Sequence, residues 1–146
     1  VKAFPNARIV RLKRNPMDSC FAIYKQPFTW AYKFSYNQDD LARYYLAHDK
    51  LFSHWRTLLG EQLIEVQYET LVNDSENETR TLLDSLGLDF EDACLNFEQN
   101  ETATTTASSV QVREKIHARS VLRWKRYEAQ LTPLRTRLEA AGIRVE

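Results

Sequence analysis

The spacing of apolar positions predicts a strand, a tight turn and a helix at the beginning of the chain. Residues 7–12 form a short apolar run with a β-branched pair at its centre, which is typical of a strand. Asn15 and Pro16 follow, and these residue types suit the cap and the first position of a helix. The next apolar side chains step by three and four, as on one helical face: Met17, Cys20, Phe21 and Tyr24. We expect this helix to end before Pro27, which cannot continue it.

A long helix and a second strand are predicted further along the chain. Apolar residues at helical spacing predict the longest helix, capped by Asp39 or Asp40 and ended by Gly60. A second strand is expected over residues 62–68. The remaining pattern predicts an aromatic-rich loop over 27–38, a helical turn over 69–72, helices over 75–86 (capped by Ser75), 90–97 and 118–131, a polar loop over 98–110, and a last helix from Pro133 to Gly142.

This order of elements predicts one predominantly helical α/β domain over residues 1–146. A strand, two helices and another strand in succession indicate a parallel sheet with helical cover. A sheet buried on both faces needs more than the two strands that the pattern shows. We therefore expect further strands to precede these residues, so that they form the C-terminal part of a larger domain.

Composition argues against several classes of protein. Apolar side chains make up 43% of the 146 residues and aromatic ones 12%, which is enough for a packed core. The formal net charge of zero argues against a nucleic-acid or membrane coat, and no apolar run approaches the roughly 20 residues of a membrane span. No signal peptide opens the chain, so we expect a cytoplasmic protein. Cys20 and Cys94 stand outside any CxxC or Cys/His cluster, so we expect buried thiols and no metal.

The zero net charge conceals a strong segregation of charge along the chain. Residues 1–26 carry six basic side chains and one acidic, and residues 113–137 carry eight basic and two acidic. Residues 61–101 between them carry twelve acidic side chains and one basic. Two interpretations remain open: the blocks are solvated helix faces that attract one another, or the two basic ends converge on a multiply charged anion.

Four segments carry candidate binding residues, two of them at strand ends. Ligands of open α/β sheets bind at the carboxyl ends of the strands. Arg14 ends the first strand at a helix N-terminus, which favours a phosphate; a structural pair with Asp18 is the alternative. Tyr68 ends the second strand, and an ordinary core tyrosine is its alternative. The third segment is the donor-rich loop 108–113, and a plain surface linker is its alternative. The fourth is Arg123 in the basic helix expected over 118–131, and its alternative is an arginine whose aliphatic stem lies on the core.

Taken together, these segments resemble motifs of the sulfotransferase family. Residues 14–24, RNPMDSCFAIY, resemble the strand–turn–helix motif that binds the 3′-phosphate of the nucleotide. Residues 66–71, VQYETL, resemble the family's "YEDL" segment. Residues 106–113, TASSVQVR, and 120–127, SVLRWKRY, are similar to the C-terminal cofactor segments of the tyrosylprotein-sulfotransferase-like, tetratricopeptide-linked bacterial branch. The similarity covers nearly the whole chain in the right order.

The resemblance implies a P-loop-like parallel-sheet fold and a metal-free reaction. This family transfers a sulfuryl group from 3′-phosphoadenylyl sulfate (PAPS) to a hydroxyl and leaves the desulfated nucleotide, PAP. By resemblance, Arg14 would bind the 3′-phosphate, Tyr68 would lie against the adenine, and Arg123 would reach the nucleotide. Four residues of the loop would line it: Ser108, Ser109, Gln111 and Arg113. The acceptor would be a peptide, a carbohydrate or a small molecule, and the source bacterial.

Two departures from the family pattern limit what these residues are expected to do. The family carries a serine eight residues after the arginine as a second 3′-phosphate ligand, and here that position is Ala22. Ser19, one helical turn nearer, is the candidate substitute. The sequence also has no glycine-rich loop for the 5′-phosphosulfate, and the catalytic base is expected upstream. We therefore expect weak PAPS binding and no catalysis from these residues alone.

Other functions fit the sequence less well. A non-catalytic binding or scaffold module of the same fold is the main alternative, with the aromatic loop and the basic helix holding a partner. Nucleic-acid binding through residues 113–137 is disfavoured, because the chain has no overall basic charge and no nucleic-acid-binding motif. An incomplete sheet would expose an edge and apolar surface, which a homo-oligomer could cover.

Overall fold

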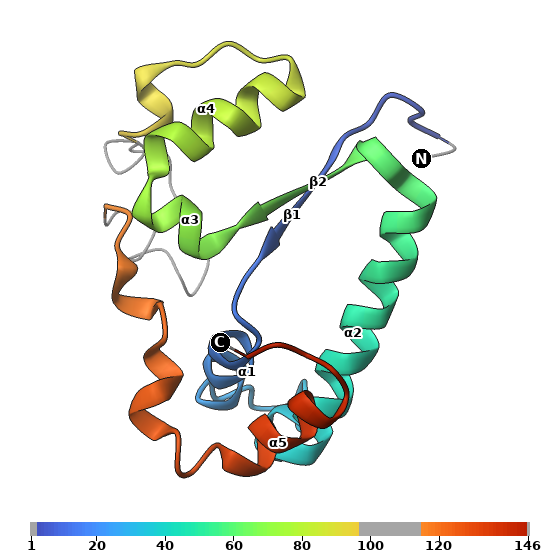
Figure 1. Cartoon of the computed structure of the whole chain (residues 1–146), viewed down its shortest axis with the longest axis vertical. Coiled ribbons are helices and arrows are strands. Elements are labelled where there is room, and N and C mark those ends of the chain that lie inside the picture. The colour runs from blue at the N-terminus through green and yellow to red at the C-terminus, as the bar shows by residue number, and fades with distance from the viewer. Residues whose placement is uncertain (1–2, 97–114, 146) are drawn as a thin grey trace.

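The computed structural model describes residues 3–96 and 115–145, and it combines helices with a small parallel sheet (Figure 1). The helices and strands are β1 (Ile9–Lys13), α1 (Pro16–Tyr24), α2 (Gln38–Leu59), β2 (Leu63–Gln67), α3 (Tyr68–Asn73), α4 (Ser75–Leu86) and α5 (Thr132–Ala140). Short 3₁₀ turns lie at Lys33–Tyr36, Gly60–Gln62, Asp92–Cys94, Ala118–Ser120 and Arg123–Tyr127. The described part of the chain is thus mostly helical, as the α/β prediction requires.

The sheet pairs the two predicted strands in parallel. Ile9 lies opposite Leu63 and Lys13 opposite Gln67, so both strands end at the same edge. Figure 1 shows α2 beginning beside α5 and running along the strands to the start of β2. Because α1 and α3 follow β1 and β2 directly, the N-termini of both helices meet at the carboxyl ends of the strands.

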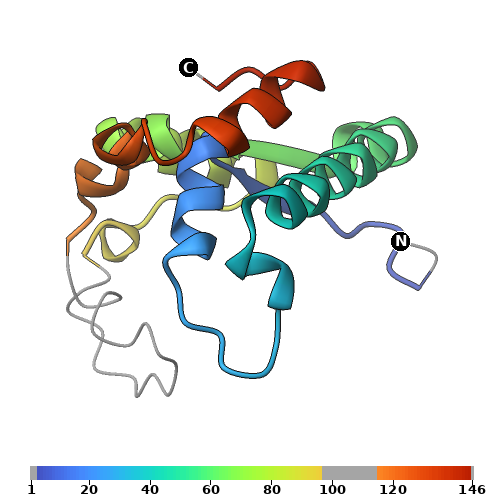
Figure 2. The same cartoon turned by 90° about the horizontal axis from the view of Figure 1, so that it is seen from below.

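The hydrophobic core lies beside the end of the sheet. Its buried side chains come from α1, the start of α2, α5 and the segments on either side of α5: Met17, Cys20, Phe21, Leu41, Ala42, Trp124, Leu131, Leu134, Leu138 and Val145. By contrast, Val10 and Leu12 on β1 are 45% and 56% exposed. Figure 2 shows α5 on one side of the molecule and the segment between α1 and α2 projecting on the opposite side. The core therefore joins the first and last parts of the chain.

Helix caps follow the predicted chemistry, with two corrections of position. Asn15 caps α1 by accepting the N–H of Asp18, and Gly87, at φ 70°, ends α4. The cap of α2 is Asn37, not Asp39 or Asp40, because its side-chain oxygen accepts the N–H groups of both.

The predictions for the cap of α4, the helix over 90–97 and the burial of Cys94 were wrong. Asp74, not Ser75, caps α4, since its carboxylate accepts the N–H of Asn77. The expected helix over 90–97 is only the turn Asp92–Cys94 within the described residues, and Ala93 and Cys94 point outward. Cys94 is therefore an exposed thiol, whereas Cys20 is buried as expected. Phe97 and the expected loop 98–110 lie outside the described residues.

The expected helix over 118–131 is also absent as a single element. Two 3₁₀ turns replace it, separated by Leu122 at φ 53°, a left-handed conformation that side chains rarely adopt. The break arises because the N–H groups of Leu122 and Trp124 are donated to the carboxylate of Asp18 instead of to helical carbonyls. Trp124 and Leu131 are nevertheless buried, as the sequence pattern indicated.

An ion network joins the sheet to α2. Arg11 is 8% exposed; its guanidinium lies 2.6 Å from Glu65 and 3.9 Å from the ring centre of Phe52. Arg56 on α2 binds the same carboxylate at 2.6 Å. Burial alone would raise the pKa of Glu65, but the hydrogen bonds from Arg56 and Arg11 outweigh it and lower that pKa below its ordinary value. Glu65 is therefore the nearer of the two carboxylates that compensate this buried arginine; Asp49 on α2 lies 4.0 Å from it.

We expect Glu65→Gln to lower the free energy of unfolding by about 1–3 kcal/mol at pH 7, because it removes the nearer acidic partner of Arg11 and leaves only the Asp49 carboxylate, 4.0 Å away. The difference in free energy of unfolding between wild type and Glu65→Gln should shrink as the pH falls below about 4.5, the ordinary pKa of the carboxyl. At such pH, protonation removes the charge of Glu65 from the wild type as well. Urea unfolding at pH 7 and at lower pH measures both effects. Glu76→Gln is the matched control, because the Glu76–Arg80 pair is half-exposed on α4. A gap between wild type and Glu65→Gln that stays constant with pH would contradict this assignment.

The described residues contain neither a metal-binding cluster nor a helix that could span a membrane. Within residues 3–96 and 115–145, no group of three His, Cys, Asp or Glu side chains is placed to hold a metal ion. No described helix has the length and apolar character needed to cross a membrane.

Candidate functional site

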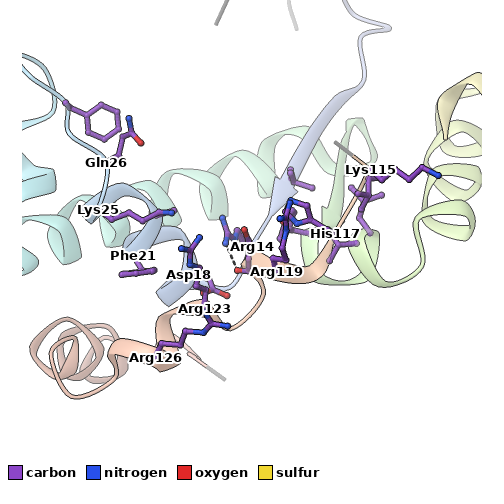
Figure 3. Close-up of a pocket in the computed structure, with 18 residues that line it drawn as sticks. Arg14, Asp18, Phe21, Lys25, Gln26, Lys115, His117, Arg119, Arg123 and Arg126 are labelled. Carbon is purple, nitrogen blue, oxygen red and sulfur yellow. Dashed lines mark hydrogen bonds between the residues drawn. The ribbon is translucent and has the colours of Figure 1, made fainter. Parts of the chain in front are cut away.

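A large pocket lies at the carboxyl ends of the two parallel strands (Figure 3). Its volume is about 1100 Å³, and its walls come from the end of β1, from α1, from α3 and from residues 115–126. The described residues that line it are Leu12, Arg14, Asp18, Phe21, Ala22, Lys25, Gln26, Phe28, Tyr68, Leu71, Val72, Lys115, Ile116, His117, Arg119, Ser120, Arg123 and Arg126. Segments more than a hundred residues apart in the sequence thus meet around one cavity.

The pocket wall is strongly basic. Its lysine and arginine side chains come from both basic blocks of the chain: Arg14, Lys25, Lys115, Arg119, Arg123 and Arg126. Asp18 is the one acidic side chain among the described lining residues, and its carboxylate accepts two backbone N–H groups. The described part of the wall therefore carries a surplus of positive charge, which suits a multiply charged anion. Cations of both basic blocks thus line one pocket, as the second interpretation of the charge pattern requires.

Arg14 is held in the pocket wall from two sides. Its Nη2 atom donates to the carbonyl oxygen of Ser120 at 2.7 Å, and its guanidinium carbon lies 4.8 Å from the ring centre of Tyr68. Its Nε atom is buried and has no hydrogen-bond partner among the described residues. A buried donor without a partner costs free energy, and an acceptor in the pocket would recover it. The alternative pairing of Arg14 with Asp18 is not found in the described structure, where Asp18 binds the backbone of residues 122 and 124.

Asn15 and Glu69 fix the geometry of the two strand ends. The carboxylate of Glu69 accepts the backbone N–H of Asn15 at 2.8 Å and also a hydrogen bond from Gln67. The side-chain amide of Asn15 donates to the carbonyl oxygen of Val145 at 3.2 Å. The start of α1, the start of α3 and the end of the chain are thereby tied together. The sequence did not indicate either residue as part of the site, because hydrogen bonds between residues 54 and 130 positions apart leave no local sequence pattern.

The structure brings some of the predicted site residues together and separates others. Arg14, Tyr68 and Arg123 all line the large pocket. Ser19 does not: it lines a second hollow of about 440 Å³ beside β1 and α2, while Ala22 faces the large pocket. The remaining predicted residues, Ser108, Ser109, Gln111 and Arg113, lie outside the described residues.

Several lining residues were not singled out from the sequence. Lys25, Arg119 and Arg126 belong to the basic blocks, so the charge segregation already pointed to their segments. Figure 3 shows Lys25 and Gln26 toward one end of the pocket and Lys115 and His117 toward the other. Which cations of the second block face the cavity depends on the turns on either side of Leu122, and no sequence pattern indicated those turns.

Comparison with known proteins places most of the described chain in a known family. A model described as "Sulfotransferase family" matches residues 1–92, which include both strands and the helices that follow them. A protein of Aquifex aeolicus (strain VF5), named "Uncharacterized protein", is 34% identical over 134 residues. That match covers 90% of this chain, and the chain spans only 18% of the length of that relative.

Proposed function

Because the chain belongs to the sulfotransferase family, we propose that its basic pocket holds the 3′-phosphate and adenine of PAPS. In this proposal the protein transfers the sulfuryl group of PAPS to a hydroxyl on a peptide, a carbohydrate or a small molecule. The observation that carries it is the convergence of cationic side chains from both ends of the chain at the carboxyl ends of two parallel strands. The tyrosylprotein-sulfotransferase-like branch is the part of the family that the motifs favour.

The chemistry of the pocket suits a phosphate monoester beside an aromatic base. Such a phosphate carries a charge of about −1.5 to −2 and offers three acceptor oxygens. The planar guanidinium of Arg14 has further N–H groups beyond the one donated to Ser120, including the buried Nε. Apolar side chains line the same cavity, among them Phe21, Leu71 and Val72, and they suit contact with an adenine.

The proposed contacts divide between charge and stacking. Arg14 and Arg123 bind the 3′-phosphate, and Tyr68 lies against the nucleotide. Ser108, Ser109, Gln111 and Arg113 complete the nucleotide wall in this proposal. Ser19 faces the other hollow, so we leave it out of the contact set, and Ala22 supplies no hydroxyl in its place.

These residues would position the nucleotide and leave the bond-breaking step to other groups. In sulfuryl transfer the acceptor oxygen forms a bond to sulfur and gives up its proton to a base, and the bond between sulfur and the bridging oxygen breaks to release PAP. Negative charge then develops at the 5′-phosphate and needs stabilisation there. The 146 residues hold three glycines and no glycine-rich loop for that purpose. We therefore propose that they form the C-terminal, 3′-phosphate half of one P-loop-like domain, and that they bind PAPS weakly without catalysing transfer.

Calorimetric titration with PAP and with adenosine 5′-phosphate tests this proposal. The two ligands differ only in the 3′-phosphate, so a formed 3′-phosphate site should bind PAP at least about tenfold more tightly, a difference of about 1.4 kcal/mol. Circular dichroism before the titration shows that the protein is folded. No binding heat from folded protein at about 1 mM PAP, a concentration that detects binding of about −4 kcal/mol, would overturn the proposal.

A further inference from the structure

The side chain of Asp18 is completely buried and joins two distant parts of the pocket wall. Its exposed fraction is 0%, and it lies in the first turn of α1. One carboxylate oxygen accepts the N–H of Leu122 at 2.5 Å, and the other accepts the N–H of Trp124 at 3.0 Å. A carboxylate held by two backbone donors forms strong, charge-assisted hydrogen bonds. Asp18 therefore fixes a segment that lies more than a hundred residues later in the chain.

Arg123 is the residue between these two donors. Leu122 has φ 53°, a left-handed conformation that is unfavourable for leucine and persists only where its surroundings hold it. Two residues earlier, the carbonyl oxygen of Ser120 accepts the hydrogen bond from Arg14. Residues 120–124 are thus tied to Asp18 at one end and to Arg14 at the other. Figure 3 shows Arg14, Asp18 and Arg123 together at the pocket wall.

We propose that Asp18 is a positioning residue of the nucleotide site. Its carboxylate holds the turn Leu122–Trp124 so that Arg123 faces the pocket on the same wall as Arg14. The ligand in this inference is that of the proposed function, whereas the positioning role follows from the hydrogen bonds that Asp18 and Arg14 make. Asp18 itself contacts no phosphate, because its negative charge would repel one.

The test compares Asp18→Asn with the wild type in titrations with PAP and adenosine 5′-phosphate. Asparagine keeps the size of the side chain but has one acceptor oxygen and turns an NH₂ group toward a backbone donor. We expect the affinity for PAP to fall about tenfold or more and the affinity for adenosine 5′-phosphate to fall about threefold or less. Asp84→Asn is the matched control, because Asp84 is exposed on α4 and does not line the pocket; it should leave both affinities unchanged.

A double-mutant cycle separates positioning from a merely structural role. If Asp18 acts through Arg123, Asp18→Asn should weaken PAP binding little further once Arg123→Gln is present, by about twofold or less. A structural role predicts additive losses and an equal loss for both nucleotides, and either result would overturn the proposal. If Asp18→Asn does not fold, Asp18→Glu replaces it; the longer side chain keeps both acceptors but displaces the turn, and it should show the same selective loss of PAP affinity.

Amide hydrogen exchange, measured without any nucleotide, separates this inference from the proposed function. The N–H groups of Leu122 and Trp124 should be protected in the wild type and should lose protection in Asp18→Asn. If Asp18→Asn loses this protection but binds PAP as tightly as the wild type, the positioning role is overturned and the proposed function still stands. Wild-type protein that shows this protection and binds no PAP would overturn the proposed function and leave the tie itself intact.

Discussion

If Arg14 binds the 3′-phosphate as proposed, Arg14→Gln should lower the affinity for PAP by about 100-fold and the affinity for adenosine 5′-phosphate by no more than about threefold. The guanidinium can donate two parallel hydrogen bonds to one phosphate, and each charge-assisted bond contributes about 1.5–3 kcal/mol. Its position is set by Ser120 on one side and by the ring of Tyr68 on the other, so little side-chain freedom is lost on binding. Isothermal titration compares wild type and variant with the two nucleotides; because the wild type is proposed to bind weakly, the expected loss appears as the disappearance of the binding heat for PAP.

Two further substitutions make the Arg14 experiment decisive. Arg14→Lys keeps the charge but loses the planar fork, so it should retain only part of the affinity for PAP. Arg8→Gln makes the same chemical change at an exposed arginine that binds the carbonyl oxygen of Glu61 outside the pocket, and it should have no effect. If Arg14→Gln lowers the affinities for PAP and for adenosine 5′-phosphate by the same factor, the substitution damages the fold, and the result contradicts the phosphate-binding role.

Replacing Trp124 with alanine lowers the free energy of unfolding by about 3–5 kcal/mol. Trp124 is 2% exposed and belongs to the core that joins α1, α2 and α5. The loss would be a large fraction of the about 5–15 kcal/mol that holds a typical domain folded. Urea unfolding followed by circular dichroism measures it, and Trp124→Phe, which leaves a smaller cavity, should lose less.

Trp30 supplies the matched control for this core prediction. Its side chain is 92% exposed in the segment between α1 and α2 (Figure 2), so Trp30→Ala should change the free energy of unfolding by no more than about 0.5 kcal/mol. Similar losses for the two tryptophans would mean that the core does not lie where α1 meets the C-terminal segment.

Local signals in the sequence were sufficient for the elements of the first half of the chain. The β-branched pair before Asn15 and Pro16 predicted β1, the turn and α1, because strand propensity, helix capping and proline geometry act within a few residues. Gly60 and Gly87 marked the ends of α2 and α4 for the same reason. The caps at Asn37 and Asp74 were missed by one to three positions, since several neighbouring polar residues can serve as a cap.

The second half of the chain was predicted less well because its backbone follows tertiary contacts. Residues 118–131 have helical apolar spacing, but Asp18 takes two of the N–H groups that a helix would use. Buried hydrogen bonds to a charged group outweigh the small differences in helix propensity between residues. A pattern read along the chain does not contain a partner that lies a hundred residues away.

For the candidate site, the sequence alone determined the kinds of side chain and the tertiary structure decided their arrangement. Charge segregation and strand-end positions pointed to Arg14, Tyr68 and Arg123, and these three line one pocket. Only the fold separated Ser19 from Ala22 and showed that Asp18 binds the backbone of Leu122 and Trp124 instead of pairing with Arg14. The physical reason is that charge and propensity are properties of single residues, whereas the partner of a buried group depends on which distant segments pack against it.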